Sequence, residues 1–232
     1  MMHQAIRQTY VGAMRKGRDV ARKTGVLEKL EARPTRRNLW LRSLFAIYDF
    51  DDLSRLDLPW WTFDAVREVD SFLRARPAAR VFEWGSGAST LWLSKRAGQV
   101  TSVEHDGEWH QMVQGRLEGV ENVTLRHVAM QDAGRVGSRK AGFVGQHFDR
   151  YVHAIRDLSG EFDLIVIDGR AREACLREAK ARLAPGGIIL VDDFKRRRYR
   201  EAAEQSGLKI RRLDGLAVCL PLPDSTALLS RV

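Results

Sequence analysis

The pattern of hydrophobic and polar residues becomes regular from residue 80 onward. Short apolar runs predict strands at residues 80–85, 99–105, 122–128, 162–168 and 187–193. The amphipathic segments between and after these runs predict helices that end near residue 97 and that span 108–117, 147–158, 172–183 and 199–207. Strands that alternate with helices form parallel sheets with right-handed crossovers, so we expect an α/β domain.

The last part of the chain has a different pattern. Residues 208–219 and 225–232 are strand-like runs joined by a proline-rich link without a helix, which predicts an antiparallel pair at the sheet edge. Residues 164–167 and 188–191 are apolar throughout, as is typical of strands covered on both faces. We therefore expect a doubly wound, mostly parallel seven-stranded sheet with a C-terminal antiparallel strand pair.

The first 77 residues are expected to be helical. Apolar residues at helical spacing predict one helix over residues 2–31 and a second over residues 35–50. Thr62 is a candidate N-cap for a third helix. This pattern predicts a basic helical extension at residues 1–77 and a sheet domain at residues 78–232.

Positive charge is concentrated in the N-terminal part. The net charge is +9, and residues 1–42 hold eleven Lys or Arg against three Asp or Glu. The rest of the chain is close to neutral, which argues against a basic groove across the protein and against a nucleic-acid partner. Residues 1–31 fit three interpretations: a solvated helix docked on the domain, a helix for peripheral contact with a membrane or an anionic partner, or an organellar presequence.

The sequence has features of a cytoplasmic protein. No apolar run approaches the roughly 20 residues that cross a bilayer, and the N-terminus lacks the apolar core of a signal peptide. Cys175 and Cys219 stand alone, without partners at metal-ligand spacing, so both are expected to be buried, reduced thiols.

Residues 80–93 (RVFEWGSGASTLWL) have the pattern of a buried strand, a glycine turn and the start of a helix. Gly85 and Gly87 allow a tight bend without a Cβ that would obstruct a ligand. Ser89 and Thr90 are candidate caps for the helix. Such a turn directs backbone N–H groups into a crevice, where α/β sheets hold nucleotide-like ligands.

Two kinds of ligand compete for this crevice. The dinucleotide fingerprint requires a third glycine where this chain has Thr90, so that match fails. Glu83 stands in the strand two residues before the first glycine. A carboxylate there repels a pyrophosphate and suits a ligand with an ammonium group.

The segment FEWGSGAS, at residues 82–89, resembles motif I (E/D-x-G-x-G-x-G) of class I S-adenosylmethionine-dependent methyltransferases. The likeness covers about residues 78–232, since Glu104 ends the second strand, LAPGG leads into the fifth, and an antiparallel pair closes the chain. The resemblance implies S-adenosylmethionine as the cofactor. It implies cofactor contacts from Glu83, Gly85, Ser86, Gly87, Ser89, Glu104, His105, Ala129 and Met130.

The resemblance also implies which part of the cofactor several of these residues contact. Glu104 is expected to accept hydrogen bonds from both ribose hydroxyls, the glycines to lie against the methionine moiety, and Glu83 to help hold its amino group. His105 is expected at the adenine edge. Residues 129–132 (AMQD) resemble a segment that borders the adenine in catechol-type O-methyltransferases. The alternative for Glu104 is a solvated carboxylate at a strand end.

Three aspartates follow two strands that we expect to be neighbours. Asp168 ends the fourth strand, and Asp192 and Asp193 end the fifth, so their carboxylates should share one crevice. Such charges repel unless a cation or proton lies among them, and oxygen ligands suit Mg²⁺. The arrangement resembles catechol-type and sugar O-methyltransferases, which implies a divalent metal on all three and catalytic roles for Asp168 and Asp192. Alternatively, Asp192 and Asp193 cap the following segment and Asp168 orders its loop.

The general base is left open by the sequence. Catechol-type enzymes place a lysine three residues after the first aspartate, where this chain has Ala171, flanked by arginines. The remaining candidates are His105, His147, His153 or the metal alone.

Three other segments bear on the acceptor. Residues 195–200 (KRRRYR) place cations at a helix start, where they oppose the dipole, so they either contact an acidic acceptor or form a solvated surface. Residues 132–146, rich in glycine and basic residues, form either a lid or a disordered loop. Trp60 and Trp61 either pack in the core or wall the crevice.

Together these features predict an S-adenosylmethionine-dependent methyltransferase. Its acceptor would be the hydroxyl of a small molecule, sugar or lipid-linked compound, acidic in one interpretation, with or without Mg²⁺. The first alternative is an aminopropyl transferase or a nicotinamide oxidoreductase on a similar sheet. The second is a non-catalytic protein that binds a membrane or partner through its basic N-terminal helix.

Overall fold

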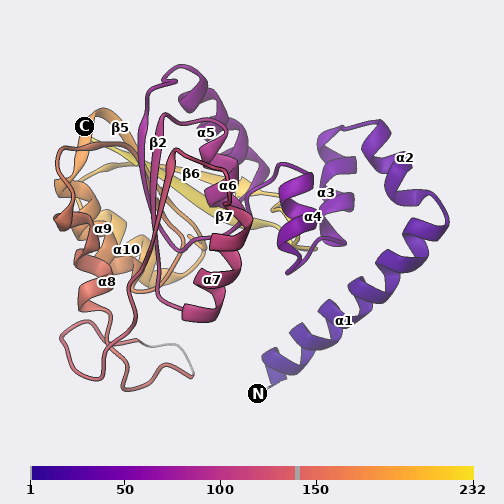
Figure 1. The fold of residues 1–232 in the computed structure, drawn as a ribbon, viewed down its shortest axis with the longest axis horizontal. Coiled ribbons are helices and arrows are strands. Elements are labelled where there is room, and N and C mark those ends of the chain that lie inside the picture. The colour runs from indigo at the N-terminus through magenta and orange to yellow at the C-terminus, as the bar shows by residue number, and fades with distance from the viewer. Residues whose placement is uncertain (1, 139–141) are drawn as a thin grey trace.

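The computed structural model describes residues 2–138 and 142–232, and a seven-stranded sheet forms the centre of this part of the chain (Figure 1). The strands are β1 (Arg80–Trp84), β2 (Gln99–Glu104), β3 (Val123–His127), β4 (Phe162–Ile167), β5 (Leu183–Val191), β6 (Lys209–Gly215) and β7 (Asp224–Ser230). Their order is β3-β2-β1-β4-β5-β7-β6. Strand β7 is antiparallel to β5 and β6, and the other pairs are parallel. The predicted fold class is confirmed.

The central strands bury both of their faces. Successive side chains of a strand alternate between the faces, so Val81 of β1 packs in one hydrophobic cluster with Leu164 of β4. Phe82 packs in the cluster on the opposite face with Ile165. This double burial accounts for the continuous apolar runs in β4 and β5.

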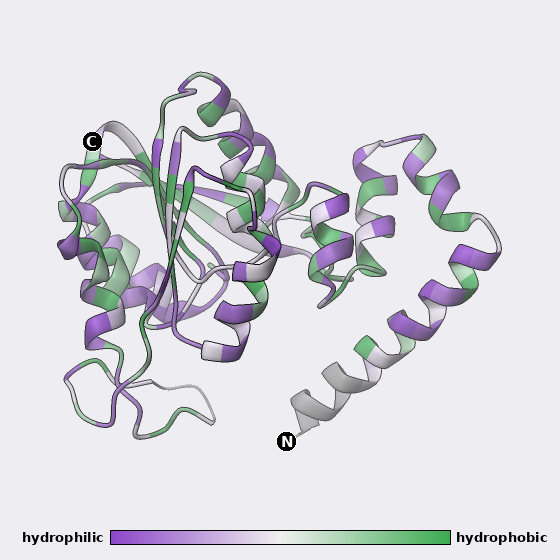
Figure 2. Ribbon diagram, viewed as in Figure 1, coloured by the Kyte–Doolittle hydropathy of each residue, from purple (hydrophilic) through white to green (hydrophobic). Residues whose placement is uncertain are grey.

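Helices cover the two faces of the sheet (Figure 1). One layer holds α5 (Phe63–Arg74), α6 (Ala88–Ser94) and α7 (Gly107–Arg116). The other holds α8 (Asp149–His153), a 3-10 helix (Ala154–Asp157), α9 (Arg172–Ala181) and α10 (Arg197–Gln205). Hydrophobic residues recur on the strands and on the helices packed against them (Figure 2). The predicted cap of α5 is confirmed, because the Thr62 hydroxyl accepts a hydrogen bond from Ala65 N.

The helices α1 (Met2–Lys23), α2 (Val26–Ala32), α3 (Arg36–Leu44) and α4 (Phe50–Arg55) lie to one side of the sheet (Figure 1). The prediction of one helix over residues 2–31 is wrong, because the chain turns at Gly25, which has a left-handed φ of 69°. The predicted helix over residues 35–50 is too long. The helix ends at Leu44, and Tyr48, with a φ of 54°, turns the chain into α4.

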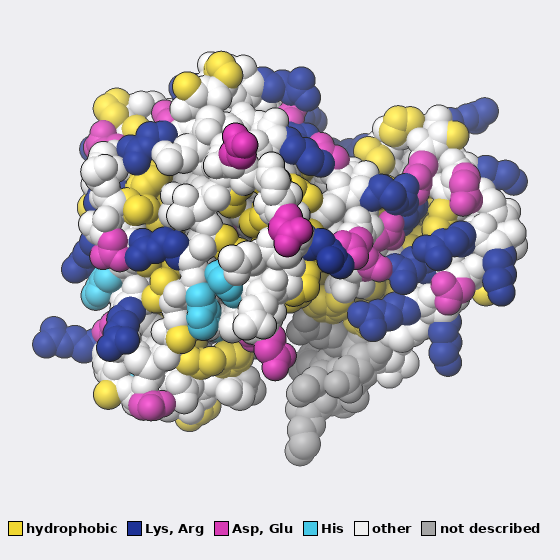
Figure 3. Space-filling view, in the orientation of Figure 1, with side chains coloured by type: hydrophobic (Ala, Val, Ile, Leu, Met, Phe, Trp, Pro, Cys, Tyr) yellow, Lys and Arg dark blue, Asp and Glu magenta, His cyan; other side chains and the backbone are white. Residues whose placement is uncertain are grey.

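Basic side chains are frequent on the surface of these N-terminal helices (Figure 3). Helix α1 packs on the other helices of the extension through Tyr10, Val11 and Met14. No helix in the described ranges is long and apolar enough to span a bilayer. Peripheral membrane contact through residues 1–31 stays a prediction, as does the domain boundary between residues 77 and 78.

The two cysteines are buried and free, as predicted. Cys175 packs in the cluster between α9 and the sheet, and Cys219 packs beneath the N-terminal helices. Burial raises the pKa of both thiols, so neither has the character of a reactive thiolate.

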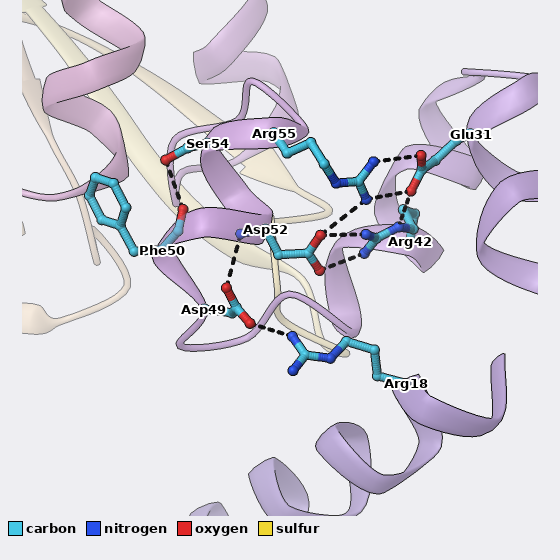
Figure 4. A network of polar contacts seen from close by, with 8 residues as sticks. All are labelled: Arg18, Glu31, Arg42, Asp49, Phe50, Asp52, Ser54 and Arg55. Carbon is cyan, nitrogen blue, oxygen red and sulfur yellow. Dashed lines mark hydrogen bonds and ion pairs between the residues drawn. The ribbon is translucent and has the colours of Figure 1, made fainter. Parts of the chain in front are cut away.

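A buried guanidinium joins three of the N-terminal helices (Figure 4). The Arg42 side chain of α3 is 1% exposed and donates to both carboxylate oxygens of Asp52 in α4, at 3.0 and 2.5 Å. Its Nε donates to Glu31 of α2 over 2.6 Å. Arg55, at the surface, binds both Glu31 and Asp52. The relative placement of these short helices therefore depends on charge pairing as well as on apolar packing.

Replacing Arg42 with alanine should lower the free energy of unfolding by about 3–5 kcal/mol, because Asp52 would lose its buried counter-charge and keep only its contact with the surface Arg55. Chemical denaturation followed by circular dichroism measures the change. Arg55→Ala is the matched control: that side chain is 53% exposed, so its loss should cost about 1 kcal/mol or less. Equal losses for the two variants would contradict the role of burial.

Candidate active site

A cavity of about 1170 Å³ lies at the edge of the sheet where the parallel strands end. Its wall combines the turns after β1, β2, β4 and β5 with part of the N-terminal extension. Strands β1 and β4 are parallel neighbours, so the turns that follow them meet at this edge. The cavity lies where the sequence predicts the ligand crevice.

The turn after β1 depends on glycine. Gly85 has a φ of 97°, and a Cβ there would lie 2.7 Å from the backbone of Gly169, in the turn after β4. The two turns can approach this closely only without a side chain at that position. At Gly87 a Cβ would meet only Trp109, at 3.9 Å. Gly87 lines the cavity, so a ligand can reach the main chain there.

The Glu104 carboxylate lies in the cavity wall beside this turn. It accepts hydrogen bonds from the backbone N–H groups of Ser86, His105 and Asp106, at 3.2, 2.7 and 2.9 Å. The residue is 4% exposed, so the alternative of a solvated carboxylate is wrong. Burial raises the pKa of Glu104, but the hydrogen bonds and the nearby His105 lower it further, to a net value below the usual one. It is therefore an ionised acceptor that suits a ligand with hydroxyl donors.

Two rings lie next to this carboxylate. The Nδ1 atom of His105 is 2.6 Å from a Glu104 oxygen, and its Nε2 atom has no hydrogen-bond partner among the described residues. Trp109 Nε1 donates to the Ser86 carbonyl over 2.8 Å and so anchors the glycine turn. His105 and Trp109 both line the cavity.

Glu83 lies beneath the turn and is not among the residues that line the cavity. Its buried carboxylate accepts hydrogen bonds from the hydroxyls of Ser89, Thr90 and Ser102, at 2.5, 2.6 and 2.7 Å. The prediction that Ser89 and Thr90 cap the helix is confirmed for Thr90 alone: Gly87 is the N-cap of α6, and its N–H donates to the Thr90 hydroxyl over 3.0 Å. Burial raises the pKa of Glu83 to about 7, although the three hydroxyls lower it. Its contact with a ligand amino group stays a prediction.

The three aspartates predicted to share one crevice do meet, and a guanidinium lies among them. Arg172 Nη2 is 2.8 Å from an Asp168 oxygen and 3.5 Å from an Asp193 oxygen. Arg172 Nη1 is 3.9 Å from an Asp192 oxygen. The described residues contain no cluster of His, Cys, Asp or Glu that could hold a metal ion. The predicted Mg²⁺ site does not fit this arrangement, because a cation of the protein itself already lies between the carboxylates.

These carboxylates are half-buried: the side chain of Asp168 is 23% exposed and that of Asp192 is 18% exposed. Burial raises the pKa of Asp168 to about 6, and burial and the neighbouring Asp168 raise that of Asp192 well above its usual range. Trp61 Nε1 donates to Asp168 over 3.3 Å, and the Thr226 hydroxyl donates to Asp192 over 2.8 Å. A carboxylate with a pKa near 6 can accept a proton at neutral pH.

The N-terminal extension supplies part of the cavity wall. Tyr48 and Trp60 line the cavity and pack edge to face, with ring centroids 4.8 Å apart. Trp61 lines it too and is fully buried, so both interpretations of the tryptophan pair hold for this residue. Asp49, the N-cap of α4, lies next to Tyr48 and is bound by Arg18 of α1 (Figure 4). The ion pairs of the extension thus support the wall.

Sequence reasoning missed most of the arginines around the cavity. Arg135, Arg170 and Arg177 line it and form no ion pair with another described residue. The sequence analysis gave Arg172 no role. Its position was a detectable signal of one, because Arg172 stands four residues after a strand-end aspartate and at a helix start, where a cation is unfavourable. From the basic segment 195–200, Arg196 pairs with Asp193, and Arg198 with Glu173, at the cavity wall.

Some predicted site residues lie elsewhere. Ala129, Met130, His147 and His153 do not line the cavity, and Met130 packs against the core instead. Of residues 132–146, several line the cavity, whereas 139–141 lie outside the described residues. An adenine contact from residues 129–131 stays a prediction.

Comparisons with known proteins agree with this geometry. Residues 82–194 match a family model described as a methyltransferase domain. The structure is similar to an O-methyltransferase from Bacillus cereus in complex with SAH, at 16% identity and a TM-score of 0.57, covering 81% of this chain and 89% of that one. It is also similar to a putative rRNA-methylase from Clostridium thermocellum, at 12% identity and a TM-score of 0.53, covering 75% and 100%. No curated protein matches the sequence.

The raised pKa of Glu83 should make stability depend on pH. The folded state holds this proton up to about pH 7 and the unfolded state only up to about 4.5, so stability falls as pH rises through that window. Glu83 should contribute about 3 kcal/mol of this fall. Denaturation at several pH values, compared with Glu83→Gln, measures the contribution.

The control for this comparison is Glu104→Gln. The pKa of Glu104 is lowered, so removing this carboxylate should not remove the decrease in the free energy of unfolding between pH 4.5 and 7. If Glu83→Gln has the same pH dependence as the native chain, Glu83 is not the titrating group.

Proposed function

Since the chain carries a class I S-adenosylmethionine-dependent methyltransferase domain, we propose that it methylates a hydroxyl oxygen of a small acceptor, such as a sugar or a lipid-linked compound. One observation carries the proposal: a single cavity joins the glycine turn and Glu104 to the Asp168 and Asp192 carboxylates. A cofactor and an acceptor can therefore meet in it. The proposal needs no metal ion.

The residues around the first part of the cavity fit the cofactor. Glu104 is an ionised acceptor suited to ribose hydroxyls, and the open backbone at Gly87 suits the methionine moiety. His105 Nε2, which lacks a partner among the described residues, suits a polar adenine edge. When bound, S-adenosylmethionine supplies an activated methyl group, so the protein has to align the acceptor, exclude water and remove a proton.

The size of the cavity is compatible with a small acceptor beside the cofactor. Pockets for one drug-sized ligand have volumes of roughly 300–1,000 Å³. A volume of about 1170 Å³ therefore exceeds the need of the cofactor alone and leaves room for a second small molecule. Tyr48, Trp60 and Trp61 offer aromatic surface to such a molecule and bring residues 1–77 into the acceptor site.

Charge on the wall favours an acceptor with an acidic group. Arg135, Arg170 and Arg177 form no ion pair with a described residue, and Arg170 stacks on the Phe143 ring, 5.0 Å from its centroid. Most carboxylates of the wall, by contrast, have a partner, such as Arg172 for Asp168. Arginine side chains recognise carboxylates and phosphates well. The test is methyl transfer from radiolabelled cofactor to neutral and acidic sugars, with RNA as a competing acceptor class.

The cofactor assignment predicts that Glu104→Ala raises the dissociation constant for S-adenosylhomocysteine at least about tenfold, because the ribose would lose its acceptor. Isothermal titration calorimetry measures it. Glu108→Ala, at an exposed carboxylate in the first turn of α7, should leave the affinity unchanged. Tight binding of NAD without S-adenosylhomocysteine binding would favour an oxidoreductase instead.

If Asp168 accepts the acceptor proton, kcat/KM should rise with pH through about 6, where its carboxyl loses its proton. Asp168→Asn should lower kcat by about 10²–10⁴-fold and remove this limb of the pH profile. Glu173→Gln, at another carboxylate of the cavity wall, should keep the profile. If the pH profile of kcat/KM is unchanged in Asp168→Asn, a group other than Asp168 accepts the proton of the acceptor hydroxyl.

A further inference from the structure

The Arg172 side chain lies between the strand-end aspartates that the sequence predicted as metal ligands. Its side chain is 8% exposed, and its oxygen neighbours come from the turns after β4 and β5. The Nε atom donates to the Gly169 carbonyl over 3.1 Å. The Nη2 atom donates to the Asp168 carbonyl over 2.6 Å and to its carboxylate over 2.8 Å. The guanidinium is therefore fixed by the backbone as well as by charge.

The backbone around Arg172 is shaped for this placement. Arg172 is the first residue of α9, where a cation opposes the helix dipole. The preceding Ala171 has a left-handed φ of 50°, and Asp193, on the facing turn, has a φ of 56°. Left-handed conformations disfavour residues with a Cβ and cluster at functional sites. The neighbouring carboxylates offset these costs.

One donor of the guanidinium is left over. Arg172 Nη1 is buried, has no hydrogen-bond partner among the described residues, and lies 3.9 Å from Asp192. Arg172, Asp168 and Asp192 all line the cavity. An unpaired buried N–H is costly in a protein, so this donor suits an oxygen atom of a ligand in the cavity.

We propose that Arg172 replaces the divalent metal of related sites: its guanidinium is the cation that lies among the three aspartates, and its free Nη1 binds the acceptor oxygen. The second part rests on the proposed O-methylation. The acceptor O–H bond breaks, its proton forms a bond with the Asp168 carboxylate, and the negative charge that develops on the oxygen faces the Nη1 donor. The enzyme thus works without Mg²⁺ and selects acceptors by a fixed hydrogen-bond donor.

The first part is tested by removing the guanidinium and titrating with Mn²⁺. Without it, Asp168 and Asp192 lose the cation between them while Asp193 keeps its ion pair with Arg196, and carboxylates without a counter-charge suit a divalent ion. Arg172→Gln and Arg172→Ala should each bind one Mn²⁺ at least tenfold more tightly than the native chain. Electron paramagnetic resonance of free Mn²⁺ measures binding. Mn²⁺ should also raise the melting temperature of these variants but not of the native chain.

Matched variants complete this test. Arg197→Ala, at an exposed arginine of α10 that does not line the cavity, should bind Mn²⁺ like the native chain, and adding Asp168→Asn to Arg172→Gln should abolish Mn²⁺ binding. Retained S-adenosylhomocysteine binding shows that the variants are folded. Equal Mn²⁺ affinity in native chain and variants, or no Mn²⁺ binding by either folded variant, would overturn the proposal without touching the proposed methyl transfer.

The second part is tested by kinetics with an acceptor that supports turnover. Arg172→Lys keeps the charge but loses the planar guanidinium and its fixed N–H donors, so kcat/KM should fall about 100-fold. The affinity for S-adenosylhomocysteine should stay within about twofold of that of the native chain. EDTA should leave the turnover of the native chain unchanged. Turnover that EDTA abolishes, or kcat/KM unaffected by Arg172→Lys, would overturn this part.

Discussion

The buried and half-buried carboxylates at the carboxyl edge of the sheet require partners, and this constraint shapes the rest of the site. Glu83 is satisfied by hydroxyls, Glu104 by backbone N–H groups, and Asp168 by the guanidinium of Arg172. These solutions differ in chemistry, and so do their effects on the pKa of each group. In each case the partners lower the pKa and burial raises it: the partners outweigh burial for Glu104, whereas burial outweighs them for Glu83 and Asp168.

The two halves of the cavity therefore differ in the protonation behaviour of their carboxylates. The half beside Glu104 offers an ionised acceptor and an open glycine backbone, which suits a ligand rich in hydroxyl donors. The half beside Asp168 offers a carboxylate of raised pKa and an unpaired N–H of Arg172, which suits proton removal from an acceptor. The sheet positions both halves because parallel neighbouring strands end at one edge.

The N-terminal extension takes part in the same site. Arg42 ties α2, α3 and α4 together from a buried position, and the end of this assembly carries Tyr48 into the cavity wall. Truncating a residue of this network would therefore alter the acceptor side of the cavity while leaving Glu104 in place. Under the proposed function, variation in the extension would change the acceptor while the residues proposed for the cofactor stay the same.

The sequence by itself determined the sheet, the antiparallel end and the positions of Glu104 and Asp168, because strand periodicity and strand-end chemistry are local features. The tertiary structure decided which partner each carboxylate has. Residues 2–31 look continuous in sequence, yet Gly25 breaks the helix once packing determines the turn. The three aspartates implied a metal, and only the folded chain brings Arg172 among them, since the contact with Asp192 spans two turns that are distant in sequence.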